Sequence, residues 1–359
     1  MKRCRPIIWV ILFVAIFLIG KSEVFASWTE QANSAGVDIE FFGVSAFDAS
    51  NVWAAGYDND NIRGTIYYYD GTGWSEQANT AATDAVFTRV SALDASNVWV
   101  GGYDYDNGRG TIYYYDGAGW SEQANTAAAN IAFAGVSALD TNNVWAAGYD
   151  YDNGHGTIYY YDGAGWSEQA NTAGVDLVFY SVSALDANNV WAAGYDIDNG
   201  RGTIYHYDGA GWGEQANTAA ADIEFAGVSA LDASNVWAAG YDWDNGHGTI
   251  YHYDGAGWSE QANTAGVDAG FAGVSALDSN NVWAAGYDFD NGRGTIYHYD
   301  GAGWAEQANT AGEDIEFRDI SIIAGSVYGW AAGYDNTNSQ GTIWSMTISS
   351  AESGGGGGL

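Results

Sequence analysis

The sequence predicts an all-β fold, a seven-bladed β-propeller with four antiparallel strands in each blade. Three observations support this prediction: a 46-residue repeat, four strand-like segments in each copy, and complementary incomplete copies at the two ends. A phrase of the form Gly-Thr-Ile-Tyr-x-Tyr-Asp-Gly-x-Gly-Trp recurs, and its closing tryptophans stand 46 residues apart. Repeats of about 40 to 50 residues are typical of propellers, solenoids and other arrays. The seven copies begin at Trp28, Trp74, Trp120, Trp166, Trp212, Trp258 and Trp304.

Each copy contains four segments with the composition of strands. In the first copy these segments, A to D in chain order, are residues 41–47, 52–57, 65–69 and 74–78. Asp, Ser and Asn between A and B are typical turn residues, and Asp70-Gly71 between C and D is a strong hairpin signal. Strand B is apolar on both faces, which requires a sheet packed against each face. Radially stacked four-stranded blades provide that arrangement.

The two ends of the array predict a closed ring. The chain begins with a single strand D around Trp28 and ends with strands A, B and C of the last copy, because no Tyr-Asp-Gly-x-Gly-Trp follows Trp344. Pairing of the Trp28 strand with the last strand C would complete the seventh blade and cover an exposed sheet edge. The last copy is also the most divergent, since residues 322–329 replace its A–B turn. Such divergence is expected of a unit at a closure seam.

The segments outside the repeats predict export. Residues 1–26 have the form of a signal peptide, with a basic start, an apolar run at residues 7–19 and a small-residue cleavage pattern at residues 24–26. The apolar run is short for a membrane span, although an uncleaved N-terminal anchor is the alternative. The propeller is assigned to residues 27–350, and residues 351–359 to a Gly-rich flexible tail. We therefore expect a secreted, periplasmic or cell-surface protein, cleaved after Ala26.

The expected mature chain is strongly acidic. It holds six arginines, no lysine and 44 acidic residues, which gives a formal net charge of −38. It also holds no cysteine, so it contains no disulfide. Such a surface repels nucleic acid and anionic lipid, so we expect neither nucleic-acid binding nor membrane insertion after cleavage. The simplest interpretation of the acidity is a solvated surface in a saline setting, and we expect a monomer.

The repeat resembles those of known propellers. The stretch Val-Ser-Ala-Leu-Asp-x-x-Asn-Val-Trp-Ala-Ala-Gly, followed by Gly-Thr-Ile-Tyr-His-Tyr-Asp-Gly-x-Gly-Trp, resembles repeats of exported bacterial β-propellers and is similar to the tectonin-type repeats of propeller lectins. The resemblance covers all seven copies and implies the architecture. Tectonin repeats have a short connection where this chain has a long Asp-x-Asp-Asn-Gly loop, so no sugar-binding residue is transferred. The Ser-x-Asp-x-Gly-x-Thr-Trp box of sialidase-like propellers is not matched.

Differences between the copies gather on one predicted face, in the B–C loop Tyr-Asp-x-Asp-Asn-Gly and in the D–A connection with the start of strand A. Aromatic, carboxylate and guanidinium groups would converge there, and these groups suit stacking and directed hydrogen bonds. We therefore predict a ligand- or partner-binding face. One alternative is that the loops pack on their neighbours and each Arg offsets local Asp charge. Another is recent duplication followed by neutral drift at tolerant loop positions. The candidate binding residues are Arg63, Arg89, Tyr105, Arg109, Tyr151, His155, Tyr180, Ile197, Arg201, Trp243, His247, Phe289 and Arg293.

The same loops raise the question of a Ca²⁺ site. Aspartates at i and i+2 are suitable ligands for a hard cation, but the Gly comes one place too early for an EF-hand loop and no Glu stands at the twelfth position. Asn-Gly is itself a hairpin signal, so the turn interpretation is preferred and no cofactor is expected to be required. The candidate metal ligands are Asp58, Asp60, Asp104, Asp106, Asp150, Asp152, Asp196, Asp198, Asp242, Asp244, Asp288 and Asp290.

Taken together, the sequence indicates a non-catalytic binding module for a carbohydrate or an extracellular protein. Catalysis needs an asymmetric set of groups, whereas nearly every polar residue here is repeated about sevenfold. The histidines in strand C, His206, His252 and His298, replace tyrosines of other copies and are expected to be packing residues. The alternatives are a structural surface propeller without a small ligand, and a propeller-fold hydrolase or lyase.

The predicted export can be tested by intact mass measurement of the protein secreted from a bacterial host. We expect a mature chain that begins at Ser27, because the small-residue pattern ends at Ala26. Replacement Ala26→Arg should block processing and leave the full-length mass. A native chain that stays in the membrane fraction and retains residues 1–26 would instead indicate an uncleaved anchor.

Overall fold

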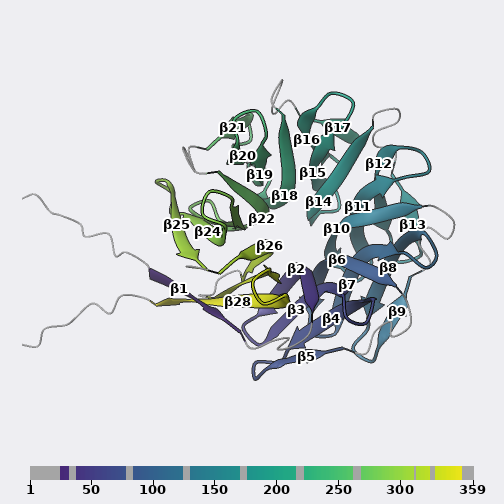
Figure 1. Cartoon of the computed structure of the whole chain (residues 1–359). Helices are drawn as coiled ribbons and strands as arrows, with labels where there is room; N and C mark the ends of the chain where they lie inside the picture. Colours follow the sequence, from purple (N-terminus) through teal and green to yellow (C-terminus); the bar gives the residue numbers. More distant parts are fainter. Residues whose placement is uncertain are drawn as a thin grey trace, which may run out of the picture.

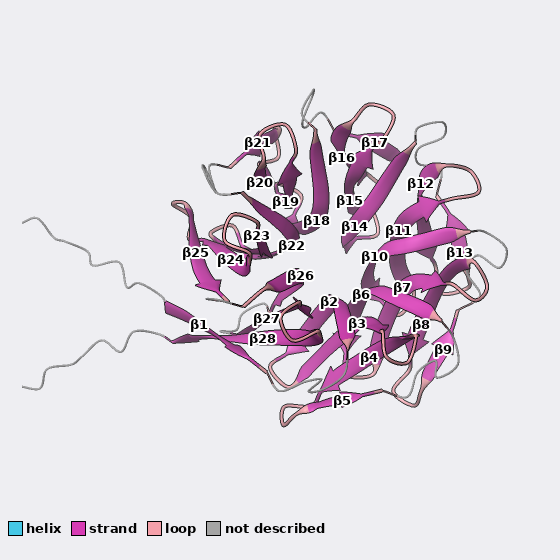
Figure 2. Cartoon of the chain, in the orientation of Figure 1, coloured by secondary structure: helices cyan, strands magenta, loops and turns pink. Residues whose placement is uncertain are grey.

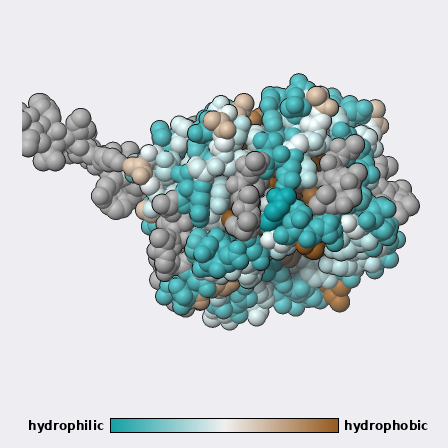
Figure 3. Space-filling model, turned by 90° about the horizontal axis from the view of Figure 1, so that it is seen from above, coloured by the Kyte–Doolittle hydropathy of each residue, from teal (hydrophilic) through white to brown (hydrophobic). Residues whose placement is uncertain are grey.

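The structure confirms the predicted all-β propeller. It is a computed structural model that describes residues 25–31, 38–77, 84–123, 130–169, 176–215, 222–261, 268–310, 313–323 and 328–349. Seven four-stranded antiparallel sheets surround a central axis (Figure 1). Strands and short turns account for the described chain (Figure 2). Seen from the side, the surface is mainly hydrophilic, with a few scattered hydrophobic residues (Figure 3).

Each blade uses its strands in the order A, B, C, D from the centre outward. The A strands are β2 (Ile39–Asp48), β6 (Ala85–Asp94), β10 (Ile131–Asp140), β14 (Leu177–Asp186), β18 (Ile223–Asp232), β22 (Ala269–Asp278) and β26 (Ile315–Ile322). The B strands are β3 (Asn51–Asp58), β7 (Asn97–Asp104), β11 (Asn143–Asp150), β15 (Asn189–Asp196), β19 (Asn235–Asp242), β23 (Asn281–Asp288) and β27 (Tyr328–Asp335). The C strands are β4 (Arg63–Tyr69), β8 (Arg109–Tyr115), β12 (His155–Tyr161), β16 (Arg201–Tyr207), β20 (His247–Tyr253), β24 (Arg293–Tyr299) and β28 (Gln340–Ser349). The D strands are β5 (Trp74–Glu76), β9 (Trp120–Glu122), β13 (Trp166–Glu168), β17 (Trp212–Glu214), β21 (Trp258–Glu260), β25 (Trp304–Asn309) and β1 (Phe25–Glu30).

The A strands are longer than predicted and carry a bulge near their start. In β2 the register with β3 shifts between Phe41 and Gly43. Opposite the bulge, β3 approaches so closely that a Cβ on Gly56 would lie 2.0 Å from the Glu40 carbonyl oxygen. Glycine is therefore required there for a steric reason, not for backbone flexibility. At the equivalent position of the second and seventh blades stand Arg89 and Asp319, which line the channel at the centre of the ring.

Blades are joined by packed aromatic side chains. Trp53 of β3 is fully buried, and its ring packs in a tilted arrangement on Tyr68 of its own blade, with ring centroids 4.4 Å apart. Its other side contacts the next blade, with Tyr115 at 5.3 Å and Trp120 edge-on at 5.7 Å. Small residues on strand B, such as Ala55, complete the same cluster and let the sheets approach. Each sheet is thus covered on both faces, as the apolar character of strand B predicts.

The ring closes as predicted. β1 pairs with β28 in the sheet β1-β28-β27-β26, with Trp28 opposite Met346. Trp28 contacts Trp283 of the sixth blade at 6.0 Å, the role that Trp120 has beside Trp53. The Thr342 hydroxyl donates a hydrogen bond of 2.8 Å to Glu30 across the seam. β1 begins at Phe25, so cleavage after Ala26 would leave residues 27–30 of this strand.

Several predicted segments lie outside the described residues. These are residues 1–24 of the signal peptide, most of every D–A connection except the last, residues 311–312 of that last connection, residues 324–327 of the divergent last turn, and the Gly-rich tail. Nowhere in the described part of the chain is there a helix long and apolar enough to cross a membrane.

Closure by Trp28 predicts a specific loss of stability. Trp28→Ala removes the aromatic partner of Trp283 and loosens β1 from β28, so we expect the free energy of unfolding to fall by about 2 kcal/mol, below the cost for a fully buried tryptophan because Trp28 is partly exposed. Urea denaturation measures this change. Thr29→Ala, at an exposed position of the same strand, is the control. Equal stability of the two variants would contradict the closure role of Trp28.

Candidate functional site

The diversified segments lie together, as the predicted topology requires. The B–C loops and the starts of the A strands are tied by backbone hydrogen bonds in all seven blades, for example from Tyr105 N to Asp84 O at 2.7 Å. We call this side of the ring the loop face; in the first blade it comprises residues 38–42 and 57–63. The opposite face carries the nearly constant A–B and C–D turns.

The first aspartate of each B–C loop builds the turn. Asp104 is 3% exposed, and its carboxylate accepts hydrogen bonds from the Asn107 backbone N–H at 3.0 Å and side-chain amide at 2.8 Å. The second aspartate, Asp106, accepts a bond from the Asp84 backbone N–H at 3.2 Å. Gly108 has φ of +59°, which only glycine adopts at low cost. The loop is therefore a turn closed by its own hydrogen bonds, and a further hydrogen bond joins it to the residue before strand A.

This geometry bears on the Ca²⁺ hypothesis. The first and second aspartates of the loop accept hydrogen bonds from the N–H groups of different residues, as Asp104 does from Asn107 and Asp106 does from Asp84. Within the described ranges no group of three or more His, Cys, Asp or Glu side chains could surround a metal ion. These observations favour the turn interpretation, and Ca²⁺ binding stays a prediction that needs a solution test.

The arginines at the ends of the B–C loops are held within their own blades. Arg109 pairs with Glu122 of strand D at 2.7 Å and lies 3.7 Å from Asp104, and Glu122 raises the pKa of the guanidinium. The same pairing to a loop Asp and a strand D Glu occurs for Arg63, Arg201 and Arg293. These groups therefore offset local acidic charge on the outer part of the loop face, as the alternative interpretation proposed.

The histidines are also engaged locally. The Nδ1 atoms of His155 and His247 lie 3.0 and 2.9 Å from the carbonyl oxygens of the next residues. In strand C, His206 stacks on Trp191 at 4.0 Å, and burial lowers the pKa of its imidazole. His252 and His298 stack on tryptophans in the same way. The strand C histidines are thus packing residues, as expected.

The hydrophobic residues at the third loop position point outward. We call this set the hydrophobic rim; it consists of Tyr105, Tyr151, Ile197, Trp243 and Phe289, which are 48 to 58% exposed. Rim rings rest edge-on against strand B tyrosines, as Trp243 does on Tyr241 at 4.6 Å. The rim is therefore exposed to solvent and supported from below.

A closed circle of hydrogen bonds lies beneath the rim. The tyrosine next to the last residue of each B strand donates to an Asp or Asn just before the next A strand, as Tyr241 does to Asp268 at 2.7 Å. Burial and this carboxylate raise the pKa of Tyr241 to about 12. The last link, from Tyr334 to Asp38 at 3.0 Å, joins the seventh blade to the first. Sequence reasoning missed this circle, although the constant Tyr and nearly constant Asp are visible in the repeat. The other donors are Tyr57, Tyr103, Tyr149, Tyr195 and Tyr287.

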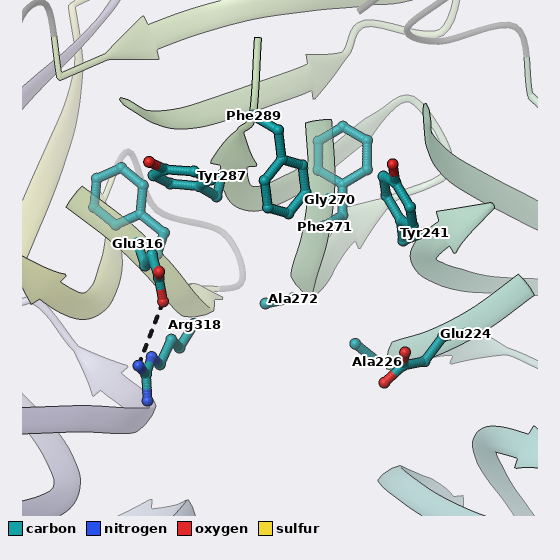
Figure 4. Close-up of a pocket in the computed structure, with 11 residues that line it drawn as sticks. Glu224, Ala226, Tyr241, Gly270, Phe271, Ala272, Tyr287, Phe289, Glu316 and Arg318 are labelled. Atoms are coloured by element: carbon teal, nitrogen blue, oxygen red, sulfur yellow. Dashed lines mark hydrogen bonds and ion pairs between the residues drawn. The ribbon is translucent and has the colours of Figure 1, made fainter. Parts of the chain in front are cut away.

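Two pockets open between blades on the loop face. One, of about 270 Å³, is lined by aromatic, acidic and small residues of the fifth, sixth and seventh blades (Figure 4). The other, of about 350 Å³, lies between the first and second blades beside Phe42 and Tyr105. Tyr180 is on β14, and its hydroxyl is hydrogen bonded to Glu224 of the next blade, which together with burial raises the tyrosine pKa.

Arg89 lies at the centre of the ring, away from the other candidate binding residues. It lines a narrow central channel of about 120 Å³, together with Asp319 and small residues of the other A strands. Arg89 donates a hydrogen bond to the Phe42 carbonyl, and Asp319 accepts one from the Val44 N–H at 2.9 Å. Both side chains are therefore hydrogen bonded to the β2 backbone, one on each side of Gly43. Burial raises the pKa of Asp319, while Arg89 opposes that shift. The structure therefore places Arg89, a candidate binding residue, in the central channel.

Comparison with known proteins supports the architecture only. No protein-family model matches the chain, and no curated protein matches its sequence. Among solved structures, YCF48 bound to a D1 peptide is similar at 15% identity and a TM-score of 0.62, over 90% of this chain and 97% of that one. YCF48 from Cyanidioschyzon merolae is similar at 16% identity and a TM-score of 0.60, over 89% of this chain and 98% of that one. U3-55K is similar at 9% identity and a TM-score of 0.65, over 89% of this chain and 98% of that one. These likenesses show the seven-bladed fold and leave a tectonin or lectin type as a separate proposal.

The turn interpretation predicts how Ca²⁺ affects stability. Because both loop carboxylates already accept hydrogen bonds, millimolar Ca²⁺ should change the melting temperature no more than Mg²⁺ does. Replacement Asp104→Ala should lower stability by about 1 kcal/mol through loss of the turn cap. Differential scanning calorimetry measures both effects. A rise in melting temperature that is specific to Ca²⁺, and that disappears in the double variant Asp104→Asn and Asp106→Asn, would instead establish a calcium site.

Proposed function

We propose that this chain is an exported, monomeric and non-catalytic module that binds an extracellular protein partner through its loop face. One observation carries the proposal: the exposed hydrophobic rim on an otherwise acidic, hydrophilic protein. Eight large hydrophobic side chains of the described residues are exposed. Six of them are in B–C loops, namely Ile62, Tyr105, Tyr151, Ile197, Trp243 and Phe289.

The distribution of these side chains favours binding over random drift. Exposed hydrophobic groups that gather on one surface, with polar residues around them, mark interaction sites. Aromatic side chains suit such sites because they bury a large area and lose little conformational entropy. The rim is also held by the tyrosine circle and by backbone bonds to strand A, so a partner would meet a preorganised surface.

Two features support a non-catalytic role. The hydroxyls of the tyrosines beneath the rim are engaged in hydrogen bonds between blades, as Tyr57 donates to Asp84 at 3.0 Å and Tyr241 donates to Asp268 at 2.7 Å. The carboxylates and arginines of the loops are held in repeated structural bonds rather than in an asymmetric set. YCF48, a neighbour of the same fold, has been solved with a bound peptide, which is compatible with peptide binding by such a scaffold.

Carbohydrate is the second candidate ligand. The exposed ring of Trp243 has Glu224 beside its indole N–H at 3.3 Å, and a ring next to a carboxylate suits a sugar's apolar face and hydroxyl groups. Repeated rim residues would also allow several weak sites to act together. We favour a protein partner because the rim of five hydrophobic residues extends over five blades.

A random displayed-peptide library tests the proposal, with a glycan array as the second arm. We expect peptides to be enriched on the native protein and lost when Tyr105, Tyr151, Trp243 and Phe289 are all replaced by Ser, because the rim supplies the contact area. The matched control is Phe47→Ser with Tyr328→Ser, which changes the exposed hydrophobic residues of the opposite face. Enrichment that is unaffected by the rim variant would overturn the proposal. Binding to glycans alone would favour the second candidate.

A further inference from the structure

The pocket between the fifth and seventh blades owes its shape to small residues at two positions of strand A. Gly270 occupies the position that holds Val86 or Val178 in other blades, and a Cβ there would lie 3.1 Å from the Phe289 ring. Ala272 occupies the position of Tyr180. The absence of these side chains opens a volume of about 270 Å³, which is enough for one long side chain.

Aromatic rings form one wall of this pocket. Phe289 stands between Tyr241 and Tyr287, with ring centroids at 5.6 and 5.2 Å (Figure 4). Phe289 is 52% exposed, so it is accessible to a partner. Aromatic faces attract a cation, and they attract a planar guanidinium most readily because it also stacks.

Carboxylates stand at two sides of the pocket. Glu316 lies 3.4 Å from Arg318, and Arg318 is bound more closely by Glu40 at 2.8 Å. Glu224, across the pocket, forms no ion pair with any described residue and accepts only from neutral donors, including the Trp243 indole at 3.3 Å. These three carboxylates and one guanidinium together leave two net negative charges around the pocket. The formal charge of the whole chain, −35, has the same sign.

Arg318 itself illustrates the recognition that this arrangement favours. Its guanidinium lies 4.6 Å from the centroid of the Phe42 ring and pairs with Glu40, so an aromatic face and a carboxylate hold one arginine at the neighbouring position of the ring. In the pocket, Phe289 and Glu224 offer the same two chemical groups, and there is space where the arginine would be.

We propose that this pocket binds an arginine side chain of the protein partner. The proposal rests on the proposed function of the loop face as a protein-binding surface and names the chemistry that the partner presents there. The guanidinium would stack on Phe289 and donate hydrogen bonds to Glu224, while its methylene groups would lie against Ala226 and Ala272. Arginine fits better than lysine because it combines stacking with paired hydrogen bonds.

The test uses the full-length mature chain and synthetic peptides in a Gly/Ser frame with one central Arg, citrulline, Lys or Glu. Binding is followed by NMR titration at physiological salt, so that general attraction to an acidic surface is screened. We expect the Arg peptide to bind at least tenfold more tightly than the citrulline peptide, which has the same shape but no charge. Lys should bind more weakly than Arg, and Glu should not bind.

Matched variants locate the interaction. Gly270→Val and Phe289→Ile introduce residues that the chain itself uses at these positions in other blades, at Val86 and Ile197, so folding should be preserved. Each should weaken binding of the Arg peptide at least tenfold, and Glu224→Gln should do the same. The controls are Ala132→Val at the position of Gly270 in the third blade, Phe47→Ile at an exposed phenylalanine of the opposite face, and Glu168→Gln in strand D of the third blade, and these should bind normally. Melting temperatures verify that every variant is folded.

The outcomes separate this inference from the proposed function. Equal binding of Arg and citrulline peptides, or unchanged binding of the Arg peptide by Gly270→Val and Phe289→Ile, would overturn the arginine pocket. In that case peptides enriched from the displayed library through the rim would still support the loop face as a protein-binding surface. Failure of every peptide in both experiments would overturn the pocket and the proposed function together.

Discussion

The contact on which this structure depends is the packing of each strand B tryptophan against the next blade. Trp53 reaches Tyr115 and Trp120, and the interaction is repeated until Trp330 meets Tyr69 and Trp74 of the first blade. Each aromatic pair contributes roughly 0.5 to 1.5 kcal/mol beyond the area that it buries. No blade covers its own faces, so stability requires the complete ring. The chain therefore supplies the last strand D from its beginning, and Trp28 completes the contact with Trp283.

A rigid repeated frame allows the loop face to differ from blade to blade. The tyrosine circle, with links such as Tyr241 to Asp268, fixes the start of every A strand beside the preceding blade. Side chains just above it can then change size without altering the frame, as Gly270 and Val178 do at equivalent positions. The result is one face with seven similar frameworks and seven different surfaces. That combination suits recognition of an asymmetric partner better than catalysis by a single set of groups.

Charge is distributed unevenly over this frame. Most arginines neutralise carboxylates within their own blades, as Arg109 does with Glu122. The desolvation free energy of these ion pairs is small because both partners stay partly hydrated. Arg318 of the seventh blade differs, because its closer partner is Glu40 of the first blade, at the inner edge of the loop face. What remains is an excess of carboxylates next to exposed rings. A cationic side chain is the natural complement of such a surface, which is why the pocket beside Phe289 points to arginine.

The sequence by itself determined the period, the strands, the turns and the closure of the ring, because these depend on local patterns and on a count of strands. It also identified the rim residues, since they vary within a constant repeat. Only the tertiary structure decided where the polar groups go. Arg63 and Glu76 meet through strand pairing, and Arg89 and Asp319 come together in the channel because ring closure brings the second and seventh blades to either side of β2. The pocket likewise depends on three blades at once, and no single repeat contains the information that places Glu224, Phe289 and Glu316 around one space.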